Sequence, residues 1–187
     1  MKGDTLLRIW STFALREHTE RVSSRLPPLL VAQLRERRHL ANEWYPIDHY
    51  LALYGALLDA AGYDEVVATA RASVGRALKD GNWRAFVPLV AGLLPETFCQ
   101  RGAKRFEMVW KITFAPGEAE VTARGTGAAD VVLKQVPWAS DRAWRGGVSG
   151  GLLAIPDMAG LDGECEVADV DGTVLFSLRW AKPPRER

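Results

Sequence analysis

Several residue types that mark particular kinds of site are scarce in this 187-residue chain, which has only two cysteines and three histidines. The cysteines, Cys99 and Cys165, lie far apart, whereas a structural zinc site needs paired ligands at short spacing. Two cysteines in unrelated contexts also provide no disulfide framework, so we expect free thiols and a reducing, cytoplasmic location.

Long apolar runs and an excess of charge are also missing. No run approaches the roughly 18–20 apolar residues that cross a bilayer. The first residues include Asp4 and Arg8 before the apolar region of a signal peptide could form. The formal net charge is +1, too small for a strong field that attracts polyanions. We therefore expect neither a membrane span nor a nucleic-acid partner.

Helical periodicity dominates the first half of the chain. A stripe of Leu6, Ile9 and Phe13 predicts a first helix, and further helices restart after the prolines at 27–28, 46 and 95. Between them, the patterns at 64–80 and 83–94 are also helical. The first half therefore predicts about six helices.

The apolar period then changes to two. Alternation at 109–114, 118–124, 131–136 and in both arms of 163–180 predicts about five mostly antiparallel strands. The Asp171-Gly172 corner is typical of a tight hairpin turn with positive φ. A helical pattern at 140–160 interrupts the strands. The expected fold is α+β, a helical layer followed by a sheet with one inserted helix, in a single domain spanning 1–181 with a disordered tail at 182–187.

The inserted helix contains the glycine-rich segment "RGGVSGG" at 145–151. It lacks the lysine of a phosphate-binding loop. Four glycines in a helix cost roughly 4 kcal/mol relative to alanine, so the segment needs a compensating role. Gly147 and Gly151 repeat on one helical face. Either that face packs closely on another element, or it lets a ligand lie against it.

No motif identifies a reaction, so we expect a protein that is not an enzyme, with no catalytic residue and no metal. Seven tryptophans either fill the core or line a cavity. In "NEWYPIDHY", Tyr45 as N-cap would bring Trp44 and His49 together as a hydrophobic staple. The ligand-binding candidates are Trp44, His49, Trp110, Trp144, Gly147 and Gly151.

A resemblance rests on the order of short motifs: "KG" at 2–3, "RLPP" at 25–28, "WYP" at 44–46 and "LPETF" at 94–98. This layout resembles a large family of myxobacterial paralogues that share a domain of unknown function. More distantly, the order of helices, hairpin, helix and hairpin is similar to the superfamily of nitric-oxide-signalling and Golgi-transport ligand-binding domains. That superfamily includes haem-NO-binding, vinyl-four-reductase and Bet3-like domains.

The resemblance implies an apolar cavity between helices and a curved antiparallel sheet, in a sensory or assembly module. The chain lacks the Tyr-x-Ser-x-Arg triplet of the haem-binding branch, so we expect no haem and no other cofactor. The expected function is a non-catalytic module that binds a small apolar ligand between helices and sheet and signals to a protein partner. The alternative is a homodimeric interaction module with a packed interior.

Overall fold

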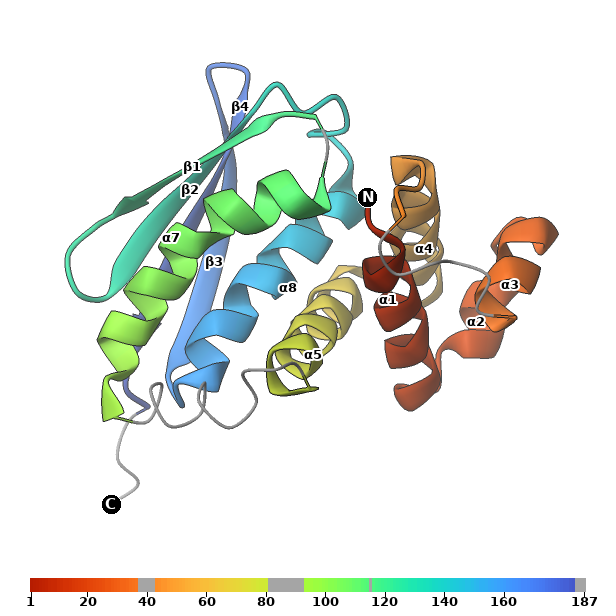
Figure 1. Cartoon of the computed structure of the whole chain (residues 1–187), viewed down its shortest axis with the longest axis horizontal. Helices are drawn as coiled ribbons and strands as arrows, with labels where there is room; N and C mark the ends of the chain where they lie inside the picture. Colours follow the sequence, from red (N-terminus) through yellow and green to blue (C-terminus); the bar gives the residue numbers. More distant parts are fainter. Residues whose placement is uncertain (37–42, 81–92, 115, 184–187) are drawn as a thin grey trace.

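The computed structural model describes residues 1–36, 43–80, 93–114 and 116–183 (Figure 1). Most of the predicted helix at 83–94, the last four residues of the predicted tail and His39 lie outside these ranges. The described elements are the helices α1 (Gly3–Leu15), α2 (Thr19–Ser23), α3 (Pro28–Arg35), α4 (Ile47–Ala61), α5 (Tyr63–Asp80), α7 (Pro95–Thr113) and α8 (Arg142–Met158), and the strands β1 (Glu118–Ala123), β2 (Ala128–Lys134), β3 (Asp162–Val170) and β4 (Thr173–Ala181).

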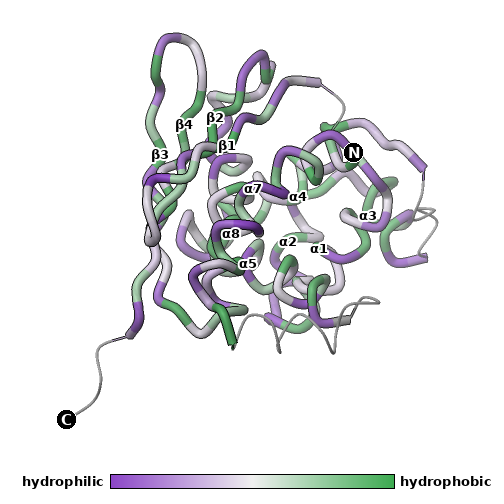
Figure 2. The backbone as a smooth tube through the Cα atoms, turned by 60° about the vertical axis from the view of Figure 1, so that its left-hand side comes forward, coloured by the Kyte–Doolittle hydropathy of each residue, from purple (hydrophilic) through white to green (hydrophobic). Residues whose placement is uncertain are grey.

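The strands form one antiparallel sheet in the order β1-β2-β4-β3. Helix α7 runs along β1, and α8 packs against β3 and β4, so both helices cover the same face of the sheet (Figures 1 and 2). Helix α5 packs on α8, α1 and α4 pack on α5, and α2 and α3 lie farthest from the sheet. The predicted α+β class is therefore confirmed.

The buried face of the sheet follows from simple alternation. In β4, Val174, Phe176, Leu178 and Trp180 are all buried, whereas the residues between them are partly or fully exposed. The turn joining β3 to β4 has positive φ at Asp171 and Gly172, 47° and 75°. This turn confirms the predicted hairpin and fixes the register that points the four apolar side chains at the helices.

The sheet has four strands rather than five, because the predicted strand at 109–114 is wrong. Those residues continue α7, and the Phe114 N–H donates to the Trp110 carbonyl at 2.8 Å. Trp110 is buried, but Ile112 is among the most exposed apolar residues, so the two do not share a face. Five alternating residues also suit the end of an amphipathic helix that began at Pro95.

The glycine-rich helix α8 packs on protein. The Asp141 carboxylate accepts a hydrogen bond from the Trp144 N–H at 2.7 Å, which makes Asp141 the N-cap of the helix. A Cβ at Gly146 would meet Val66 of α5. A Cβ at Gly150 would overlap the backbone of α5 at Val67. Glycine therefore lets α8 and α5 approach almost backbone to backbone, and this close approach is the compensating role of Gly146 and Gly150.

Candidate functional site

A pocket of about 270 Å³ lies where the helical layer meets the connections of the sheet. Four segments build it: the start of the chain, the approach to α4, the end of α7 with its turn into β1, and the connection from β2 to α8. Its lining is predominantly apolar and rich in aromatic rings: Met1, Trp44, Tyr45, Ile47, Phe114, Pro116 and Trp138. We call it the junction pocket.

Backbone hydrogen bonds hold two of these segments together. The Tyr45 N–H donates to the Met1 carbonyl at 2.8 Å, and the Gly3 N–H donates to the Glu43 carbonyl at 3.0 Å. The Trp44 side chain is 48% exposed, and the Lys2 ammonium lies 4.6 Å from the centre of its ring. The outer wall of the pocket is thus a half-exposed indole placed by a short antiparallel pairing.

Helix α4 begins later than the sequence predicts, and this changes the partner of His49. Pro46 is the N-cap and Ile47 the first helical residue. The His49 ring therefore stacks on Tyr45, with centroids 6.4 Å apart, rather than on Trp44 as predicted. Burial is the largest cause of a lowered pKa for His49, which favours the neutral imidazole. The neutral ring stacks on Tyr45, which lines the pocket.

Phe114 connects the pocket to an aromatic core. Its ring stacks on Trp110 at 4.6 Å between centroids and meets Tyr50 edge-on at 5.7 Å. Trp144 contacts Trp110 at 6.2 Å and Phe176 of β4 at 6.1 Å. Each of these three side chains is at most 1% exposed. Aromatic rings therefore fill the space between α7, α8 and the sheet.

The same ring contacts continue into the helical layer. Tyr50 meets Tyr54 at 4.8 Å, and Tyr54 meets Phe13 of α1 at 6.4 Å. Both tyrosines are buried, and burial raises their pKa values. A continuous series of aromatic contacts thus joins the wall of the junction pocket to the sheet on one side and to α1 on the other.

Only one of the predicted ligand-binding residues, Trp44, lines the junction pocket. His49 lies behind Tyr45, while Trp110 and Trp144 belong to the core. A Cβ at Gly147 would overlap the Tyr50 hydroxyl, and one at Gly151 would lie 3.6 Å from Val74 of α5. The structure therefore does not bring the six residues together at one surface.

The predicted ligand-binding residues do not include the pocket residues Phe114, Pro116 and Trp138. The alternation at 109–114 predicts a strand that ends at Phe114, and Pro116 is part of the predicted turn that follows it. Trp138 lies in the connection between β2 and α8, between Pro137 and the Asp141 cap. The signal in the sequence is an aromatic residue within two positions of a proline at each of three connections, and it does not show that these connections meet.

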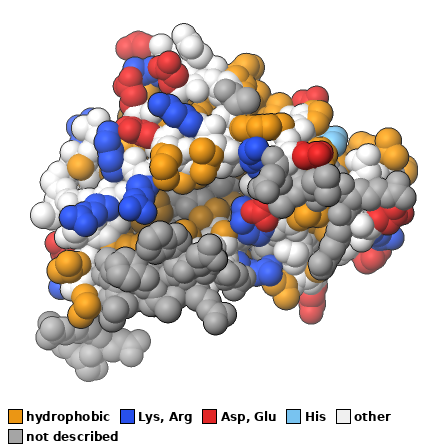
Figure 3. Space-filling model, in the orientation of Figure 1, with side chains coloured by type: hydrophobic (Ala, Val, Ile, Leu, Met, Phe, Trp, Pro, Cys, Tyr) orange, Lys and Arg blue, Asp and Glu red, His pale blue; other side chains and the backbone are white. Residues whose placement is uncertain are grey.

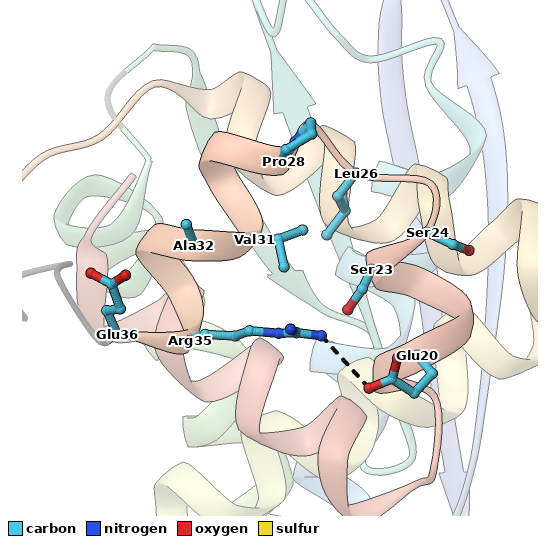
Figure 4. A pocket seen from close by; sticks show the side chains of 9 residues that line it. All are labelled: Glu20, Ser23, Ser24, Leu26, Pro28, Val31, Ala32, Arg35 and Glu36. Carbon is cyan, nitrogen blue, oxygen red and sulfur yellow. Dashed lines mark ion pairs between the residues drawn. The ribbon is translucent and has the colours of Figure 1, made fainter.

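A larger groove of about 640 Å³ runs between α2 and α3 (Figure 4). Across it, Arg35 approaches Glu20 at 3.6 Å, and both side chains are more than half exposed. Such an ion pair contributes little to stability or binding. Among the described residues no group of three or more His, Cys, Asp or Glu side chains could hold a metal ion. The groove has no aromatic residue in its lining, so we place the candidate site at the junction pocket.

Glu65 of α5 is the centre of a polar cluster between α5 and the end of α1. One carboxylate oxygen accepts hydrogen bonds from Arg16 at 2.6 Å and Thr69 at 3.2 Å, and lies 2.9 Å from His18 Nε2. The hydrogen bond from Arg16 is the largest cause that lowers the pKa of Glu65 to about 2. The ionised carboxylate thereby ties the end of α1 to α5.

We expect Glu65→Gln to destabilise the protein at pH 7 and to lose this effect in acid. A folded-state pKa below the unfolded one adds stability above the unfolded pKa, and this stability is lost as the pH falls through the folded pKa. The two proteins should therefore converge between about pH 5 and pH 2, measured by urea unfolding at a series of pH values. Asp4→Asn, which breaks the exposed Arg8–Asp4 pair, is the control. A difference for Glu65→Gln that stays constant with pH would contradict this assignment.

Comparison with known structures identifies the fold as that of the H-NOX domains. No protein-family model matches the chain, and no curated protein sequence matches it. The unliganded Fe(II) H-NOX protein from K. algicida aligns over 100% of both chains with a TM-score of 0.66 and 13% identity. The H-NOX protein from S. oneidensis in its Fe(II)NO state aligns over 97% of this chain and 100% of its own, with a TM-score of 0.65 and 9% identity. An oxygen-binding H-NOX domain related to soluble guanylate cyclases aligns over 100% and 98%, with a TM-score of 0.63 and 12% identity. The expected likeness to haem-NO-binding domains is thus confirmed at the level of the fold.

The residues that the structure describes do not fit a haem. The space between α7, α8 and the sheet holds the rings of Trp110, Trp144 and Phe176, which leave no room for a porphyrin. Helix α7 contains no histidine. Of the described histidines, His18 faces Glu65 and His49 stacks on Tyr45. Neither lies in the aromatic core, so neither described imidazole is placed there to ligate an iron.

Proposed function

We propose that the chain is a non-catalytic sensory module of the cytoplasm, which binds a small apolar molecule in the junction pocket and signals to a protein partner. The observation that carries the proposal is the position of that pocket: one apolar hollow touches the start of the chain, α4, the end of α7 and the approach to α8. Both cysteines are free thiols, which agrees with a reducing compartment.

The neighbouring structures support a sensory role because their names describe H-NOX proteins with iron, NO or oxygen states. In this chain the ligand would be smaller than a haem, since about 270 Å³ lies below the usual range of about 300–1,000 Å³ for ligand pockets. A ligand there would contact Phe114, whose ring touches both Trp110 and Tyr50. It would thereby favour one arrangement of the helical layer relative to the sheet, and a partner would read that arrangement.

The test is thermal unfolding with a panel of indole, 1-naphthol, decanol and a monoterpene alcohol, together with native mass spectrometry of protein purified from its own host. A ligand at 100 times its Kd should stabilise the fold by about 2.7 kcal/mol, which corresponds to a rise in Tm of roughly 5–10 °C for a chain of this size. Ile47→Trp, which adds an indole to a pocket-lining position, should remove the shift. The control Leu29→Trp adds the same ring to an exposed site on α3 and should keep it. A bare mass together with no shift across the panel would refute the proposal.

A second candidate function is a homodimeric interaction module with a packed interior. The complete burial of Trp110, Trp144 and Phe176 favours it, because a ligand-free core of this kind needs no occupant. Light scattering separates the candidates: a mass that rises with protein concentration, in a protein that shows no ligand shift, would favour the second.

A further inference from the structure

The outer face of α7 is an exposed surface of mixed apolar and basic character. Arg101, Arg105, Met108 and Ile112 follow at i, i+4, i+7 and i+11 and are all exposed, so they form one stripe. Met108 and Ile112 are each 56% exposed, and Val109 beside them is 42% exposed. Figure 3 shows apolar side chains gathered beside Lys and Arg side chains over this helix. Three large apolar side chains grouped this way on a helix form one apolar patch rather than scattered surface residues.

One flank of α7 covers the β1 edge of the sheet. Glu107 accepts a hydrogen bond from the backbone N–H of Val121 in β1 at 2.8 Å, and Lys104 donates to the Val121 carbonyl at 3.3 Å. Farther along, the Gln100 amide donates to the Gly125 carbonyl at 2.7 Å. These contacts hold the helix against β1 and occupy the edge where a strand from another chain could pair. A partner at α7 must therefore bind side chains rather than extend the sheet.

The two arginines of the outer stripe are available for a partner, whereas the lysines lie on the flank beside Glu107. Lys104 pairs with Glu107 at 2.6 Å. Within the described ranges, no ion pair involves Arg101, Arg105 or Lys111. Two arginines therefore lie at one end of an apolar centre and Lys111 lies on its flank, beside Glu107, which is the arrangement of a binding surface with a charged rim.

We infer that the outer face of α7 docks an amphipathic helix of a partner protein, with an apolar stripe on Met108, Val109 and Ile112 and acidic residues opposite Arg101 and Arg105. This inference rests on the proposed function, because it names the kind of partner that reads the domain. The stripe from 101 to 112 is about 16 Å long at 1.5 Å per residue, which matches about three turns of a docked helix.

Two other occupants fit this surface less well. In a symmetric antiparallel pair of α7 helices, Arg101 and Arg105 of one copy would face the Lys111 end of the other, so the charges would repel. A membrane would receive three apolar side chains and no aromatic anchor, whereas helices that lie in the membrane interface present a broad apolar face with Trp, Phe or Leu. The surface therefore suits an acidic partner helix.

The experiment measures the fluorescence anisotropy of a labelled helical peptide of about 18 residues, about five turns, with leucines on one stripe and glutamates beside it. We expect Arg101→Glu/Arg105→Glu and Met108→Ser/Ile112→Ser each to weaken binding at least tenfold without changing the melting midpoint. The affinity of the wild-type protein should fall as salt is added. The control Arg25→Glu/Leu29→Ser makes the same two kinds of change on exposed residues near α3 and should leave binding unchanged.

Three outcomes would overturn the inference. The first is no peptide binding, or binding that neither pair of α7 substitutions weakens. The second is binding to phosphatidylserine vesicles that the same substitutions abolish, which would assign the surface to a membrane. The third is a concentration-dependent dimer that the substitutions dissociate, which would assign it to a second copy. The peptide assay contains no apolar ligand, and the ligand assay contains no peptide, so failure of one proposal is distinguishable from failure of the other.

Discussion

Gly150→Ala is expected to destabilise the protein by about 3 kcal/mol, near the upper end of the range for overpacking a core. A Cβ at this position of α8 would overlap the carbonyl oxygen of Val67 and lie 2.9 Å from the backbone N of Arg71. Both are backbone atoms of α5, so they cannot rotate away as a side chain would. The two helices would have to separate along their length, and α5 and α8 form the most extensive contact between elements described in this structure.

The control for this prediction is the next residue of the same helix. A Cβ at Gly151 would meet Val74 at 3.6 Å, an ordinary van der Waals distance. Gly151→Ala should therefore be neutral or stabilising, because removing a glycine from a helix interior gains up to about 1 kcal/mol. Urea unfolding of both variants measures the difference. Equal midpoints would show that Gly150 does not set the distance between α5 and α8.

This contrast shows what the glycine-rich segment reveals before the structure is known. The helix and the need for a flat face follow from local sequence, and the structure contains a helix capped by Asp141 with a close neighbour on that face. The identity of the neighbour does not follow, since Gly146 and Gly150 face α5 whereas Gly147 faces Tyr50 of α4. Local propensity predicts that a face must be flat, but only the long-range packing decides what covers it.

The two local errors have physical causes of the same kind. Residues 109–114 alternate as a strand does, yet they extend a helix that started at Pro95, because Trp110 finds its burial beneath that helix. At α4, Pro46 rather than Tyr45 is the cap, and a shift of one residue gives His49 a different ring to stack on. A short sequence pattern fits two local structures equally well, either two periods or two cap positions, so the tertiary contacts decide between them.

The junction pocket illustrates the limit for the candidate site. Trp44, one of the predicted ligand-binding residues, lines the pocket, although the predicted staple between Trp44 and His49 does not form. Phe114, Pro116 and Trp138 join it from segments more than 60 residues away in sequence. Each of these side chains is unremarkable in its own segment. Their meeting depends on how α7 and α8 cover the sheet, which no single segment encodes.

Trp144→Ala is the other substitution with a large expected effect, a loss of about 3–5 kcal/mol in the free energy of unfolding. The indole is fully buried between Trp110 and Phe176, so its removal leaves an apolar cavity rather than an exposed surface. Within the described part of the chain, its N–H has no hydrogen-bond partner, so no acceptor is left unpaired by the change. Trp44→Ala, which truncates a half-exposed indole, is the control and should cost less. Urea unfolding measures both losses.

Indole should then bind the Trp144→Ala protein and restore part of the lost stability, because a dry cavity lined by apolar side chains takes up apolar molecules of its own shape. At 100 times its Kd, indole would return about 2.7 kcal/mol, measured as a rise in the urea midpoint. Adding Ile47→Trp separates this effect from the junction pocket: the double variant should keep the indole response, since the new cavity is in the core. A response lost in the double variant would place the bound indole in the junction pocket. If indole still raises the urea midpoint of the double variant, the bound indole lies in the core. Trp144 would then fill the space between helices and sheet where the likeness to ligand-binding domains predicts a cavity.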